Sequence, residues 1–163
     1  MKNLLLFIVL FCVFNCKTNM ENANAENAKK ENSEMRTTEF NVIAKGNLYG
    51  SGSEGIVAQN LVITNQNDWD KLISQMNSVN KVSDSFKETN IDFSKHTIIA
   101  VFDEVKGSGG HSLELTITTN SENTIVNITK IAPNGVATSV MTQPYYIIKI
   151  AKRNLPIEFI TSF

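Results

Sequence analysis

Thr97-Ile98-Ile99-Ala100-Val101-Phe102 is an unbroken apolar run, and Leu113-Glu114-Leu115-Thr116-Ile117-Thr118, shortly after it, alternates apolar with polar residues. A continuous run of β-branched and aromatic residues is typical of a central strand that is buried on both faces. Strict alternation is typical of a strand with one buried face. These two stretches predict a mainly β fold.

Shorter segments of the same kind predict the remaining strands. We expect strands at about 38–45, 56–64, 125–131 and 145–150, and a short edge strand at 156–160. The polar stretch between 77 and 95 is expected to be mostly loop, with three side chains that reach the core, namely Phe86, Ile91 and Phe93.

One helix is expected after the second strand. Asn65 is a suitable N-cap, and the residues that follow repeat at helical spacing along one apolar stripe, namely Trp69, Leu72, Ile73 and Met76. Asp68 lies near the positive end of the helix dipole.

The element order is therefore ββαββββ, which leaves no room for repeated βαβ crossovers. We expect an antiparallel sheet curled into a sandwich or partial barrel, with the helix covering one opening. A chain of 163 residues with 42% hydrophobic content is long enough for one ordinary core.

The N-terminus predicts export. Lys2 precedes an apolar run over residues 4–14 that has the length of a signal-peptide core and is too short to span a bilayer. Val13-Phe14-Asn15-Cys16 lies where a lipobox is expected, although Asn15 replaces the usual small residue. We expect diacylglycerol on the sulfur of Cys16; an uncleaved anchor and a conventional secreted protein are the alternatives.

These features divide the chain into a signal peptide at 1–15, a disordered tether at 16–37 and a single β-rich domain at 38–163. The tether is rich in Asn, Glu and Lys and has almost no apolar residues with which to order itself. Lys17, rather than Asp, after the cysteine favours the outer membrane, on its periplasmic or surface face.

Composition narrows the classes of function. The net charge of -1 offers no basic face for nucleic acid. Both cysteines, Cys12 and Cys16, precede the domain, which leaves it no disulfide and no thiolate zinc site. We expect no cofactor and no metal.

Three motifs suggest chemistry but lack its context. Gly50-Ser51-Gly52-Ser53-Glu54-Gly55 has the spacing of a dinucleotide-binding loop, yet a strand and not a helix is expected after it. Gly107-Ser108-Gly109-Gly110-His111 places a hydroxyl near an imidazole without the spacing of a nucleophile elbow, and fits a glycine-rich hairpin. Four side chains could also meet across that hairpin and hold a divalent cation, although acidic residues beside an exposed turn are usually solvated; they are Asp103, Glu104, His111 and Glu114.

Contacts with a partner are expected at the hairpin and at an aromatic pair. The hairpin residues are Gly109, Gly110 and His111. Tyr145 and Tyr146 are neighbours in a strand, so one ring should enter the core and the other should point outward.

The segment from about 93 to 152 combines an apolar strand, a Gly-Gly turn, a proline-marked turn and a Pro-Tyr strand, carried by Asp92-Phe93, 97–102, Gly107-Ser108-Gly109-Gly110-His111-Ser112-Leu113, Ile131-Ala132-Pro133 and Thr142-Gln143-Pro144-Tyr145-Tyr146. In this pattern it resembles the PrcB family of protease-complex subunits. The resemblance extends to Leu61-Val62-Ile63-Thr64 and Asp68-Trp69. It implies a non-catalytic accessory lipoprotein that associates with or stabilises a secreted, subtilisin-like protease, and no catalytic residue.

The leading hypothesis is therefore a membrane-anchored binding module with no enzymatic activity. The alternative is a small apolar ligand-binding or envelope-stress lipoprotein whose sheet encloses a cavity. A hydrolase is a third class, for which the sequence offers no coherent catalytic set.

Overall fold

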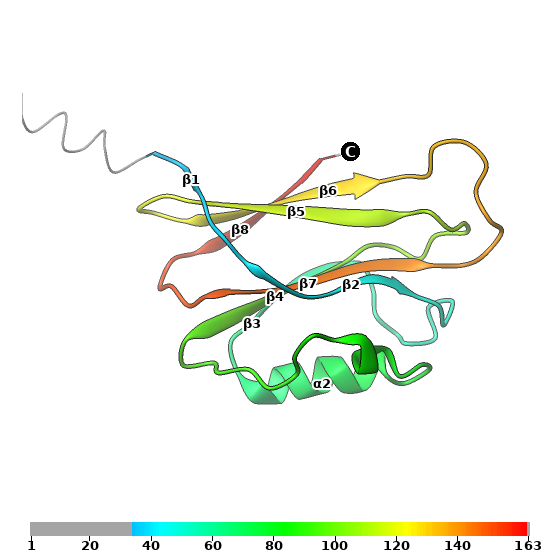
Figure 1. Ribbon diagram of the computed structural model, residues 1–163, viewed down its shortest axis with the longest axis horizontal. Helices are drawn as coiled ribbons and strands as arrows, with labels where there is room; N and C mark the ends of the chain where they lie inside the picture. Colours follow the sequence, from blue (N-terminus) through cyan, green and yellow to red (C-terminus); the bar gives the residue numbers. More distant parts are fainter. Residues whose placement is uncertain (1–33, 163) are drawn as a thin grey trace, which may run out of the picture.

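A computed structural model describes residues 34–162 of this chain, in which two four-stranded sheets and a helix form three stacked layers (Figure 1). The middle layer, here the inner sheet, has the strand order β2-β7-β4-β3. Its strands are β2 (Asn41–Leu48), β3 (Gln59–Ile63), β4 (His96–Phe102) and β7 (Gln143–Ala151).

The second layer, here the outer sheet, has the strand order β1-β5-β6-β8. Its strands are β1 (Arg36–Thr37), β5 (Ser112–Thr119), β6 (Thr124–Ile131) and β8 (Ile157–Ser162). β1 pairs with the end of β5 and then continues into β2 of the inner sheet, so the sheet structure begins at Arg36, two residues before the expected start of the domain.

The third layer is α2 (Gln66–Met76), followed by the short 3-10 helix η1 (Val82–Ser85). The predicted N-cap is confirmed, because Asn65 Oδ1 accepts a hydrogen bond from Asp68 N at 3.0 Å. Trp69, Leu72 and Met76 are buried against the inner sheet. The helix therefore covers a face of the sheet, and not an opening as expected.

The inner sheet is buried on both faces, which explains the unbroken apolar run in β4. Toward the helix it contributes to one core cluster, which includes Ile98, Ala100 and Phe102. Toward the outer sheet it contributes to a second cluster, which includes Ile99 and Val101. Phe86, Ile91 and Phe93 pack against the first cluster, as predicted.

The outer sheet has one buried face, in agreement with the alternation in β5. Leu113, Leu115 and Ile117 are buried, whereas Glu114 and Thr116 are exposed. The sandwich form of the prediction is confirmed. One pairing differs from the expected antiparallel pattern: β8 is parallel to β6, because the chain returns from β7 in the inner sheet before it joins the outer one.

Candidate functional site

Three connecting segments meet at one end of the sandwich, opposite the end at which the described chain begins (Figure 1). They are residues 49–58 between β2 and β3, 103–111 between β4 and β5, and 132–142 between β6 and β7. We call this end of the molecule the loop end. It contains the glycine-rich segment that the sequence analysis selected.

The glycine-rich segment is not a hairpin, which corrects the expectation. β4 lies in the inner sheet and β5 in the outer sheet, so residues 103–111 cross between the sheets. Lys106 N donates to Thr142 O at 2.7 Å and Thr142 N donates to Lys106 O at 3.0 Å. This segment is therefore paired with the β6–β7 loop and not with itself.

The two glycines of the predicted partner site are needed for packing between these loops. Gly109 is buried, and a Cβ there would lie 2.4 Å from Thr138 Oγ1. Gly110 has φ +82, and its Cβ would lie 2.9 Å from Pro133 Cβ. Only a residue without a side chain permits this approach. Gly109 thus supports the loop end from within, and Gly110 does so at its surface.

His111 is half-buried beside the serine that precedes the glycine pair. Ser108 Oγ and His111 Nε2 are 3.0 Å apart, and Asn47 Nδ2 donates to His111 O at 3.3 Å. A serine nucleophile also needs its histidine to be oriented by a third group. Within residues 34–162, no carboxylate contacts the ring of His111.

Tyr145 and Tyr146 are both buried, so the prediction that one ring points outward is wrong. The reason is that β7 lies in the inner sheet, where both faces are covered. Tyr145 packs on the helix side, where burial raises its pKa and a hydrogen bond with Ser85 opposes the rise. Tyr146 faces the outer sheet, with Lys45 Nζ 5.2 Å from the centre of its ring.

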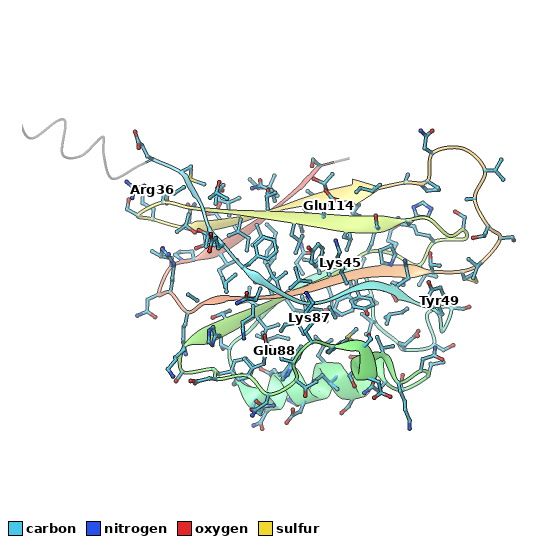
Figure 2. All side chains as sticks on the ribbon, in the orientation of Figure 1. Arg36, Lys45, Tyr49, Lys87, Glu88 and Glu114 are labelled. Atoms are coloured by element: carbon cyan, nitrogen blue, oxygen red, sulfur yellow. The ribbon has the colours of Figure 1, made fainter. Side chains whose placement is uncertain are left out.

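Asp103 lies at the centre of a cluster of ion pairs, at the place where a cation site was considered. Its buried carboxylate contacts Lys130 Nζ at 2.6 Å and Lys106 Nζ at 3.2 Å. Glu104 contacts the same Lys106 at 3.6 Å, whereas Glu114 is exposed on the outer sheet (Figure 2). The described part of the chain brings no three His, Cys, Asp or Glu side chains together as metal ligands.

Residues 50–55 form a closed turn with no helix behind it. The segment leads into β3, so no helix N-terminus is available for a pyrophosphate. The turn is filled by the buried side chain of Glu54, whose Oε1 accepts a hydrogen bond from Gly50 N at 2.9 Å. A Cβ at residue 50 would lie 2.3 Å from that oxygen, which accounts for the glycine.

The most exposed side chain of the loop end, Val136, was not among the predicted contact residues. Val136 is fully exposed, and Val140 and Met141 are 40% and 46% exposed on the same loop. Two more exposed apolar side chains, Tyr49 and Val57, lie on the β2–β3 segment of this end (Figure 2). A signal was present, because residues 131–148 contain no Asp, Glu, Lys or Arg.

Three clefts open at the surface of the described structure. Two clefts of about 560 and 570 Å³ flank residues 37–39, far from the loop end. A third, of about 170 Å³, opens between the sheets beside Asp103 and Lys130. The cores on either side of the inner sheet are filled by side chains such as Ile98, Ile147 and Ile148, each of which is 0% exposed.

Comparison with protein-family models, with curated proteins and with solved structures gave no match to this chain. The lipidation site expected at Cys16 lies outside the described residues, as do the predicted signal peptide and most of the tether. Between residues 34 and 162, no helix has the length and apolar character that crossing a membrane requires.

Proposed function

We propose that this chain is a non-catalytic lipoprotein of the bacterial cell envelope whose loop end binds another envelope protein. The observation that carries the proposal is the uncharged segment 131–148, whose loop exposes Val136, Val140 and Met141. Exposed apolar side chains that gather on one loop are typical of an interaction site. The PrcB-like pattern supports a secreted, subtilisin-like protease as the partner.

The expected anchor fits this arrangement. The described chain begins at the end of the sandwich opposite the loop end (Figure 1). Residues 16–34 can span at most ~65 Å when fully extended. An anchor at Cys16 would confine the domain to a layer near the membrane and raise its effective concentration for partners on the same surface.

The hydrogen bonds between two of the loops also support a binding role. Gly109 N donates to Thr138 O at 3.0 Å, and Lys106 and Thr142 bridge the same two loops. Loops that are already ordered lose little conformational entropy when a partner binds. The clefts near residues 37–39 are lined mostly by polar side chains, so the structure offers less support for an apolar ligand.

A photo-crosslinking experiment in the native cell tests the proposal. A benzophenone amino acid is placed at residue 136, and a matched control carries it at Lys71, which is exposed on α2. We expect ultraviolet light to join the residue-136 protein to a distinct envelope protein, identified by mass spectrometry. The control should not give this product.

Two outcomes would contradict the proposal. If positions 136 and 71 give the same crosslinked products, the loop end is not the interface. The anchor is tested by metabolic labelling with a clickable palmitate, with a known lipoprotein in the same cells as the positive control and the Cys16→Ala variant as the background. If the positive control is labelled and the wild-type chain is not, the proposed lipid anchor is wrong.

A further inference from the structure

The end of the domain at which the described chain begins, here the tether end, holds a polar cleft of about 560 Å³. Its walls come from β1 and the residues after it, from the β5–β6 turn, and from the residues that follow β7. This volume lies within the range of small-molecule sites. The cleft is distinct from the loop end.

Two arginines line this cleft, and neither pairs with a carboxylate of the described residues. Arg36 lies where the described chain enters the domain (Figure 2), and Arg153 lies just beyond β7. Within residues 34–162, neither forms an ion pair within 4.0 Å, although five lysines do, namely Lys71, Lys95, Lys106, Lys130 and Lys149. A guanidinium group is suited to phosphate, because its planar N–H donors match two phosphate oxygens.

The cleft also contains charges of the opposite sign. Glu34 and Glu39 line it, both are exposed, and neither forms an ion pair with another described residue. Two cations and two anions that face one space without neutralising each other are complementary to a ligand that carries both charges.

The β5–β6 turn adds a neutral donor. Asn120 Oδ1 accepts hydrogen bonds from Glu122 N and Asn123 N, each at 2.8 Å. Asn120 lines the cleft, and its Nδ2 amide has no hydrogen-bond partner among the described residues. Because an amide N–H donates to an oxyanion without adding charge, Asn120 suits the phosphate part of such a ligand.

We propose that this cleft binds a phosphoethanolamine group. Arg36, Arg153 and Asn120 donate to the phosphate oxygens, and the carboxylates of Glu34 and Glu39 accept from the ammonium. Recognition needs both halves of the ligand, which separates this site from a general anion site. No covalent step is involved.

The expected source of the ligand is the head group of phosphatidylethanolamine. This part of the inference rests on the proposed anchoring at Cys16, because an anchored tether brings the tether end close to the membrane surface. Affinity for the soluble group does not depend on the anchor, so the two claims can fail separately.

Isothermal titration of full-length protein in dodecyl maltoside micelles tests the site. The titrants are phosphoethanolamine, inorganic phosphate and ethanolamine. We expect saturable binding of phosphoethanolamine, at least about tenfold tighter than of either half alone, since charge-assisted hydrogen bonds at both ends contribute. Equal affinity for phosphoethanolamine and inorganic phosphate would overturn the proposal, as would the absence of binding.

Two double variants test which residues bind the phosphate and which bind the ammonium group of the ligand. R36Q/R153Q should weaken phosphoethanolamine binding by at least about tenfold, whereas K71Q/K81Q, which removes the same charge from another face, should not. E34Q/E39Q should weaken binding of phosphoethanolamine but not of phosphate. Far-UV circular dichroism checks that each variant is folded, and an R36Q/R153Q protein that binds like the lysine control would overturn the assignment.

Nanodiscs separate the two sources of the ligand. In discs that contain phosphatidylethanolamine, the head group should compete with added phosphoethanolamine and lower its apparent affinity relative to phosphatidylglycerol discs. Equal apparent affinities in the two discs would overturn the lipid head group as the source and leave soluble phosphoethanolamine as the ligand.

Discussion

Single glycines decide how the loops at the functional end of this protein fit together. Gly109 and Gly107 lie two residues apart in the same segment but in opposite environments. A Cβ on Gly109 would overlap Thr138 Oγ1, whereas a Cβ on Gly107 would meet nothing within 4 Å. Within the glycine-rich segment, packing therefore requires glycine at position 109, whereas position 107 has space for a side chain.

We predict that Gly109→Ala lowers the free energy of unfolding by about 1–3 kcal/mol, because inserting a methyl group into a packed contact displaces the opposing loop. Gly107→Ala should change it by less than about 0.5 kcal/mol, as is usual at open surface positions. Urea denaturation followed by Trp69 fluorescence measures both. Equal losses in the two variants would show that the contact with Thr138 is unimportant.

Helix α2 depends on a short polar motif at its start and on an apolar stripe along its length. Asn65 Oδ1 accepts from Asp68 N, and Asn65 Nδ2 donates to Asp68 Oδ2 at 2.8 Å. Trp69 Nε1 donates to Thr89 O at 2.8 Å, which ties the helix to the following loop. The cap fixes where the helix begins, and the stripe fixes which face it buries.

Asn65→Ala should lower the free energy of unfolding by about 1 kcal/mol, since the first turn loses the side chain that satisfies one of its free N–H groups. Asn67→Ala is the control, because Asn67 is exposed in the same turn and its side chain makes none of the hydrogen bonds seen in residues 34–162. Thermal unfolding monitored at 222 nm compares them. A control that costs as much as the cap variant would contradict the capping role.

The two sheets are joined at the loop end by the ion-pair cluster around Asp103. This residue follows β4 of the inner sheet, and Lys130 lies on β6 of the outer sheet. Burial alone would raise the pKa of Asp103, but hydrogen bonds from Lys130, the Glu104 backbone amide and Lys106 outweigh it and lower the pKa below the ordinary value of 3.8. The stability of the sandwich should therefore depend on pH through this cluster.

The lowered pKa of Asp103 sets the sign of the effect. Its contribution to stability is fully present above pH 3.8, where the unfolded state is also ionised, and is lost as pH falls through the lower pKa of the folded state. Asp103→Asn should cost about 1–3 kcal/mol at neutral pH, because charge-assisted hydrogen bonds from Lys130 and Lys106 are weakened while both ammonium groups stay partly exposed to water. The variant should also show a shallower decline in stability below pH 3.8.

Denaturant unfolding at several pH values measures this. Glu104→Gln is the control, because the exposed side chain of Glu104 contacts Lys106 and not Asp103, and the substitution keeps the backbone amide that donates to Asp103. It should retain the acid dependence of the wild type. If the free energy of unfolding of Asp103→Asn falls as steeply in acid as that of the wild type, another carboxylate accounts for the pH dependence.

The sequence alone was enough to predict the mainly β fold, the helix with its cap at Asn65, and the approximate positions of every strand of the described residues except β1, which lies in the predicted tether. These features depend on neighbouring residues: the periodicity of apolar side chains and the hydrogen bonds of a local cap. The buried run in β4 predicted a strand covered on both faces for the same reason. The expected signal and lipidation pattern is also local, and it stays a prediction.

Tertiary structure decided which strands are partners and which side chains are exposed. Pairing β4 with β7, and not with β5, turned the expected hairpin into a crossing between sheets and buried both Tyr145 and Tyr146. Arg36 and Arg153, 117 positions apart in the chain, line one cleft only because β1 and the end of β7 meet at the tether end. Contacts between distant segments depend on how layers stack, and the local pattern of a segment does not encode its partner.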